Sequence, residues 1–276
     1  MVRLFGRLLV VLAALGLATG AQAEQPYITL ASTTSTENSG LFAQILPQFT
    51  ADTGIAVRVV AVGTGQALRL ARNGDADVLL IHHRPSEEAF VAEGFGVARH
   101  DVMYNDFVLI GPKDDPAGIA GQSDAAGALA NIAAAKSPFV SRGDDSGTHK
   151  KERGLWQAAG SDPAGASGTW YREAGAGMGA TLNIAQAMGA YSLSDRATWA
   201  AFANRGDLAI LLEGDPALFN PYGVILVNEA RHPHVKSKDG QALVDWLISE
   251  RGQATIGAFT LEGEQMFTPN AEQPDS

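Results

Sequence analysis

Cysteine is absent from all 276 residues of this chain, and positive charge is scarce: 20 lysines and arginines stand against 30 aspartates and glutamates. A chain without cysteine forms no disulfide and binds no metal through thiolates. An acidic excess disfavours nucleic acid and anionic membrane surfaces, because both are bound by clustered lysine and arginine. We therefore expect neither as a partner. An anionic ligand would have to be attracted by local donors rather than by the overall field.

The longest apolar run of the sequence lies near its N-terminus. Arg3 and Arg7 precede the run Leu8–Leu17, and small residues follow up to Ala23. This arrangement is typical of a cleaved secretory signal peptide, whereas a transmembrane anchor needs roughly 20 unbroken apolar residues. We predict that residues 1–23 are a signal peptide and that the protein is periplasmic. Loss of the two arginines would change the formal charge from −10 to −12.

The next part of the chain alternates strand-like and helix-like segments. Buried strands are predicted at Tyr27–Thr33, Ile55–Gly63 and Val78–His83. Between them, helices are predicted at 41–54, despite Pro47, and from Thr64 to Asn73-Gly74. This β-α-β-α-β order is typical of a parallel sheet with helices on its faces.

Similar segments continue to the end of the chain. The later strands are predicted at 104–112, 138–143, 208–214 and 222–228. Helices are predicted in the alanine-rich stretch ending at Ala135, at 148–159, at 181–188 and within 241–259. We expect the tail after Phe267 to be disordered.

Four of the predicted helices begin in loops rich in hydroxyl residues and glycine. These loops are Ser32–Thr36, Gly63–Gly65, Ser146–Thr148 and Gly177–Asn183. Each offers backbone N–H groups and small or hydroxyl side chains at the positive end of a helix dipole, which suits a small oxyanion. One such loop alone is most simply an ordinary helix cap. The recurrence of four favours a shared anion site.

Charged residues precede the third of these loops. Arg142 would supply the formal positive charge, in a fork that can donate two parallel bonds to adjacent oxygens. Asp144 and Asp145 would repel an anion if they pointed at it. We therefore expect them to cap the following helix or to orient Arg142 from outside.

The same segment, SRGDDSGTH at 141–149, also allows an enzyme interpretation. Ser146 could be a nucleophile and His149 its base, but the segment lacks the G-x-S-x-G pattern of a nucleophile elbow. A helix that begins near Thr148 would also turn the His149 ring away from the loop. A secreted serine hydrolase that uses Ser146 is the alternative from another functional class.

Two histidine pairs raise a metal-binding interpretation, since imidazole suits zinc and copper. His82 and His83 are adjacent on a predicted strand, so their side chains point to opposite faces and cannot chelate together. His232 and His234 flank Pro233, and a surface loop accounts for them equally well. We expect no metal site and no cofactor.

Several motifs together are similar to those of a known family. STTST, AVGTGQAL, ADVLLIHH, MYNDFVLIGP, SRGDDSGTHKKE, WYREAGAGMGATLN, LEGDP and YGVILVN occur in this order over nearly the whole mature chain. They resemble the periplasmic tungstate-binding proteins of ABC importers, and SRGDDSGTHKKE is the most specific of them. The resemblance implies a binding protein, not an enzyme, that is a monomer and delivers an oxyanion to a membrane permease.

The resemblance also implies an α/β fold with two lobes, each a mostly parallel sheet flanked by helices. Lobe 1 would combine 24–106 with 223–276, and lobe 2 would be 107–222. The segments YNDFVLIGP and YGVILVN would be the two crossover strands. Closure of the lobes around the ligand would be a hinge motion.

Ten residues match the family's binding positions. They are Thr33, Thr34, Ser35, Thr64, Arg142, Ser146, Thr148, Gly179, Ala180 and Thr181. The last three are expected to act mostly through backbone N–H groups, and Ala180 stands where relatives often carry a hydroxyl residue. Tungstate is the expected ligand. Molybdate, sulfate and phosphate remain open, since tungstate and molybdate are tetrahedral dianions of nearly equal size.

Overall fold

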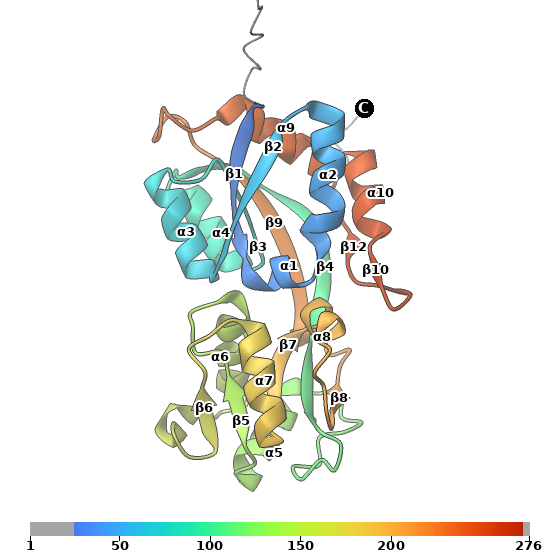
Figure 1. Cartoon of the computed structure of the whole chain (residues 1–276). Coiled ribbons are helices and arrows are strands. Elements are labelled where there is room, and N and C mark those ends of the chain that lie inside the picture. Colours follow the sequence, from blue (N-terminus) through green and yellow to red (C-terminus); the bar gives the residue numbers. More distant parts are fainter. Residues whose placement is uncertain (1–24, 273–276) are drawn as a thin grey trace, which may run out of the picture.

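The computed structural model describes residues 25–272, so the predicted signal peptide lies outside the described residues. Figure 1 shows two lobes, one above the other, connected by the long strands β4 (Gly96–Pro112) and β9 (Phe219–Val227). Within residues 25–272, no helix is long and apolar enough to cross a membrane. The predicted two-lobed α/β fold with two crossover strands is confirmed.

The sheet of the first lobe has the strand order β12-β4-β9-β3-β1-β2. Besides the crossover strands it contains β1 (Tyr27–Thr33), β2 (Ala56–Val62), β3 (Val78–Ile81) and β12 (Thr268–Pro269). As predicted, β1 pairs in parallel with β2 and β3. The sheet as a whole is nevertheless mixed rather than mostly parallel. β9 runs antiparallel to both β3 and β4, because it returns from the second lobe.

The end of the described chain corrects one expectation. Thr268 and Pro269 are not disordered: they pair antiparallel with Tyr104 and Met103 at the edge of this sheet. Phe267, just before them, is buried and meets the ring of Tyr222 edge-on at 5.5 Å. The apolar anchor therefore holds a two-residue strand that has little strand propensity of its own.

Six helices and a small hairpin complete the first lobe. They are α1 (Thr34–Asn38), α2 (Leu41–Thr53), α3 (Thr64–Asn73), α4 (Arg84–Ala92), α9 (Ser237–Ile248), α10 (Glu250–Gly257) and the pair β10 (Thr260–Leu261) and β11 (Glu264–Gln265). α2 tolerates Pro47 because its apolar side chains are buried against the sheet. It ends at Gly54, whose φ of 76° is the left-handed conformation that glycine adopts without strain.

The second lobe is built around the far half of β4. β7 (Ser192–Asp195) and β8 (Leu208–Leu212) pair antiparallel with β4, while β5 (Phe139–Ser141) pairs in parallel with β6 (Tyr171–Glu173). Its helices are α5 (Ala125–Ala135), α6 (Gly147–Ala158), α7 (Met178–Met188) and α8 (Arg196–Ala201), with short 3-10 turns at Pro163–Ala166 and Pro216–Leu218.

The buried apolar residues form clusters that follow the two lobes. Two clusters draw on residues before 104 and after 221, with Ala197 of α8 as the exception. Two others lie wholly between Phe107 and Leu218. These clusters support the proposed lobe boundaries near 106/107 and 222/223, with Tyr222 itself packed in the core of the first lobe. The region where the crossover strands pass between these cores is the natural place for a hinge.

Candidate anion-binding site between the lobes

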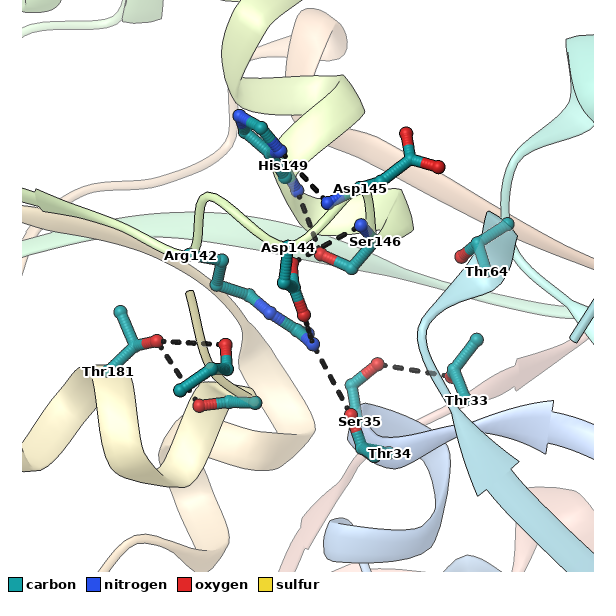
Figure 2. Close-up of polar contacts among 12 residues, drawn as sticks. Thr33, Thr34, Ser35, Thr64, Arg142, Asp144, Asp145, Ser146, His149 and Thr181 are labelled. Carbon is teal, nitrogen blue, oxygen red and sulfur yellow. Dashed lines mark hydrogen bonds and ion pairs between the residues drawn. The ribbon is translucent and has the colours of Figure 1, made fainter. Parts of the chain in front are cut away.

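Four helices begin where the lobes face each other: α1 and α3 from the first lobe, α6 and α7 from the second. Figure 2 shows Thr33, Ser35 and Thr64 on one side, opposite Arg142 and Ser146. Most of the ten predicted residues are buried; Thr34 and Gly179 are half-buried, and Ala180 is exposed. A cavity of about 450 Å³ lies between the lobes and is lined in part by Thr34, Gly63, Asp144 and Gly177.

Three hydrogen bonds hold the lobes in direct contact at this site. The Arg142 Nη2 donates to Thr34 Oγ1 at 3.3 Å, and the Gly147 N–H donates to Thr64 Oγ1 at 2.8 Å. The Thr198 hydroxyl donates to the carbonyl of Ser35 at 3.3 Å. Because Thr64 accepts with its oxygen, its own hydroxyl proton is left to donate elsewhere.

Thr33 serves mainly the local structure of its loop. Its Oγ1 caps α1 by accepting the N–H of Thr36 at 3.3 Å, and it also contacts the hydroxyls of Ser35 and Thr36 at 3.1 and 2.7 Å. The run of hydroxyl residues is thus partly a capping network. The N–H groups at the first two positions of α1 are left without an intrahelical partner.

Arg142 lies at the centre of the site and is 2% exposed. Its Nη2 also pairs with Asp144 Oδ2 at 2.6 Å, and Asp144 Oδ1 accepts the Ser146 N–H at 3.2 Å (Figure 2). Asp144 therefore both orients the guanidinium and braces the start of α6, as expected. Asp145 is exposed and lies 3.6 Å from the ammonium of Lys150.

Buried polar atoms without a partner mark the same place. Among the described residues, neither Arg142 Nε nor Thr148 Oγ1 has a hydrogen-bond partner, and Thr148 is fully buried. A buried donor left unsatisfied costs about 1–3 kcal/mol, so a pair of them beside helix starts indicates a place for a bound acceptor. Asp195 Oδ2 is likewise unpartnered, and burial raises the pKa of Asp195.

The turn before α7 supplies fewer donors than expected. The N–H and the hydroxyl of Thr181 both bond to the carbonyl of Gly177, each at 3.1 Å. Both donors of Thr181 are thus engaged in its own helix, and its role in the site stays a prediction. The unpaired N–H groups of this turn are those of Met178, Gly179 and Ala180, the first three helical positions.

Ser146 and His149 do not form a nucleophile and base. Ser146 Oγ accepts the backbone N–H of His149 at 3.2 Å and so caps α6. The His149 ring does not turn away from the loop as predicted: its Nδ1 accepts the N–H of Asp145 at 3.1 Å (Figure 2). The short loop before α6 brings the N–H of Asp145 within hydrogen-bonding distance of the His149 ring. With that nitrogen occupied and the serine serving as a cap, no relay is formed.

Sequence analysis missed one residue of the site, His82. β3 ends at Ile81, so His82 follows the strand, at the same carboxyl edge as the hydroxyl loops. It is buried, with Nε2 at 3.1 Å from Ser35 Oγ and Nδ1 at 3.0 Å from Asn220 Oδ1. Burial lowers the pKa of His82 to about 4, so the ring is neutral at pH 7.

His83 and His234 have partners of their own. His83 Nδ1 lies 2.7 Å from Ser86 Oγ, and His234 Nε2 lies 2.9 Å from the carbonyl of Gly74. Across residues 25–272, no three His, Cys, Asp or Glu side chains are arranged to hold a metal ion.

Two α/β lobes that meet over helix starts and a buried arginine are the architecture of a protein that encloses a small ligand. A family model described as a PBP superfamily domain matches residues 19–251. The tungstate-binding protein TupA of Peptoclostridium acidaminophilum is 48% identical over 248 residues, which are 88% of this chain and 86% of that protein.

Two solved structures agree with this. The tungstate-binding protein TupA from Desulfovibrio alaskensis G20 is 49% identical, with a TM-score of 0.76 over 90% of this chain and 100% of that one. The tungstate ABC transporter structure from Geobacter sulfurreducens is 49% identical, with a TM-score of 0.77 over 84% and 98%. The chain belongs to the TupA family within the PBP superfamily.

Proposed function

We propose that this chain is the substrate-binding component of an ABC importer, and that it captures tungstate between its lobes and delivers it to the membrane permease. The observation that carries the proposal is the pair of buried, unpartnered donors, Arg142 Nε and Thr148 Oγ1, at the start of α6. The names of the relatives support tungstate as the anion.

Donors from both lobes would surround the anion. Arg142 supplies the formal positive charge, Thr148 and Thr64 supply hydroxyl protons, and the starts of α1, α6 and α7 supply N–H groups. The proposed binding positions are Thr33, Thr34, Ser35, Thr64, Arg142, Ser146, Thr148, Gly179, Ala180 and Thr181. Among them, Thr33, Ser146 and Thr181 also shape the loops through hydrogen bonds of their own.

Because the donors come from both lobes, an anion between them would stabilise the closed form. Release to the permease would then require the lobes to separate and to withdraw half of the donors. We further propose that residues 1–23 direct export and that the mature protein works as a monomer in the periplasm, where it would meet the permease of the inner membrane.

Calorimetric titration of the mature protein with tungstate, molybdate, sulfate and phosphate tests the proposed function. We expect tungstate to bind tightly and phosphate to compete poorly even in large excess. Phosphate is partly protonated at neutral pH, and its hydrogen would need a free acceptor. The carboxylate paired with Arg142, that of Asp144, already accepts from Arg142 and Ser146. Another buried carboxyl, that of Asp195, has its pKa raised by burial. Displacement of tungstate by phosphate at comparable concentration would contradict the proposal.

A further inference from the structure

A buried chain of hydrogen bonds leads from the hydroxyl loop to the hinge. Ser35 Oγ contacts His82 Nε2 at 3.1 Å, His82 Nδ1 contacts Asn220 Oδ1 at 3.0 Å, and Asn220 Nδ2 donates to Asn105 Oδ1 at 2.7 Å. All four side chains are at least nine-tenths buried. The chain therefore links the first loop of the site to a distant part of the fold through side chains alone.

The far end of this chain lies on both crossover strands. Asn105 of β4 and Asn220 of β9 are opposite each other in the antiparallel ladder, where these strands pass between the lobes. Figure 1 shows that β4 and β9 connect the two halves of the molecule. A change in the relative orientation of the lobes would act on the strands that carry this pair of asparagines.

The side-chain amide of Asn220 indicates which atom donates and which accepts in each hydrogen bond of this chain. Asn220 uses its Nδ2 to donate to Asn105 and to the hydroxyl of Tyr222, so its Oδ1 is the acceptor for His82. With Asn220 in this orientation, His82 carries its proton on Nδ1. In a neutral ring Nε2 is left as an acceptor, and the Ser35 hydroxyl donates to it. The proton of Ser35 is thus directed away from the cleft.

His82 also touches the second lobe. A Cβ atom at Gly147, the first residue of α6, would come within 3.0 Å of His82 Cε1, so the start of α6 lies directly against the imidazole edge. On its other side the ring stacks on Tyr222, with centroids 4.8 Å apart. The imidazole is therefore enclosed by the hydroxyl loop, the start of α6 and the hinge strands.

We propose that His82 is a positioning residue for anion capture. Its Nε2 accepts a hydrogen bond from the Ser35 hydroxyl, and the ring ties the hydroxyl loop to the paired asparagines of the crossover strands. The loop then presents its backbone N–H groups, rather than the Ser35 hydroxyl, to the anion when the lobes close. This inference rests on the proposed function, because its readout is the binding of tungstate.

A matched pair of substitutions separates the two bonds of the ring. In H82N the amide can replace Nδ1 and keep the bond to Asn220, whereas in H82Q it can replace Nε2 and keep the bond to Ser35. We expect each variant to bind tungstate about fivefold or more weakly in calorimetry, the fold-change for one lost hydrogen bond. H83Q is the control and should bind like the wild type, because His83 contacts Ser86 instead.

Nitrogen NMR of the histidine rings in the wild-type protein supplies a readout that simple packing would not affect. We expect His82 to be protonated on Nδ1 and unprotonated on Nε2. The opposite tautomer, or wild-type affinity in both H82N and H82Q, would overturn the inference. If the wild type fails to bind tungstate, the proposed function falls, and the tautomer alone then decides whether the chain of hydrogen bonds exists. Where a variant does not fold, the tautomer measured in the wild-type protein decides the question.

Discussion

At the scale of single residues, the site depends on how one buried cation is shared. Arg142 is held by Asp144 through one terminal nitrogen, while its Nε has no partner among the described residues. The carboxylate balances the guanidinium charge and keeps the fork in place. An anion in the cleft would therefore use the remaining edge of the fork and the neighbouring helix starts.

Replacement of Arg142 tests this arrangement. R142A should weaken tungstate binding by at least about 100-fold in calorimetry, because the buried dianion loses its fixed countercharge and faces Asp144 directly. R142K should recover only part of the affinity, since an ammonium cannot reproduce the fork. The double variant R142A/D144A removes the repulsion and serves as the control. Unchanged affinity in R142A would contradict the assigned site.

Thr148 allows a test in which stability and binding change in opposite directions. Its hydroxyl is fully buried and unpartnered, so T148V should leave the melting temperature of the ligand-free protein unchanged or raise it. The same change should weaken tungstate binding about fivefold or more, because one donor is lost. T148S keeps the hydroxyl and should bind nearly as the wild type. A T148V variant that binds normally would exclude this donor.

At the scale of elements, α6 joins the site to the core of the second lobe. Its first turn holds Ser146 and Thr148, and one turn further Glu152 is buried against Trp156 and Tyr171. Trp156 Nε1 and the Tyr171 hydroxyl both donate to Glu152 Oε1, at 3.1 and 2.8 Å. Burial nevertheless raises the pKa of Glu152 to about 7, from an ordinary value of 4.5.

This raised pKa predicts how the stability of the lobe depends on pH. The folded state holds the Glu152 proton up to about pH 7, whereas the unfolded chain loses it near pH 4.5, so stability falls as pH rises between these values. E152Q mimics the protonated acid and should lack this decline. The stability of E152Q relative to the wild type should therefore rise from pH 5 to pH 8, by up to about 3 kcal/mol in the free energy of unfolding. Melting temperatures of both proteins across this pH range measure the trend. A constant difference would show that Glu152 is ionised throughout.

At the scale of the whole molecule, the candidate anion site lies between the lobes of an acidic protein. After loss of residues 1–23 the formal charge would be −12, so the long-range field repels an anion. Attraction must then come from buried donors at short range, where dissolved ions screen weakly.

Ionic strength tests whether buried donors, rather than surface charge, bind the anion. Between about 0.01 and 0.15 M salt, over which the Debye length falls from about 30 to 8 Å, we expect tungstate affinity to change by less than about threefold. Titrations of the wild-type protein in sodium chloride measure this. A tenfold loss of affinity over the same range would indicate that surface charge, not the enclosed donors, binds the anion.

The sequence by itself determined the local elements and the kind of site. The strand Tyr27–Thr33 was predicted with the bounds that it has, and four helix starts with hydroxyl residues and glycine were recognised because capping depends on neighbours along the chain. The two-lobed fold came from motif resemblance. Arg142 was identified because its guanidinium fork, just before the third loop, suits the oxygens of an anion.

Only the tertiary structure decided which donors are free. Thr181 is engaged by its own turn, Thr33 by a cap, and Thr148 by nothing among the described residues, and these differences depend on packing rather than residue type. His82 could not be assigned from sequence, because its partner Asn220 is 138 positions away. The direction of β9, and with it the mixed sheet, likewise follows from the return of the chain between the lobes. Contacts of this kind arise only when folding brings distant segments together.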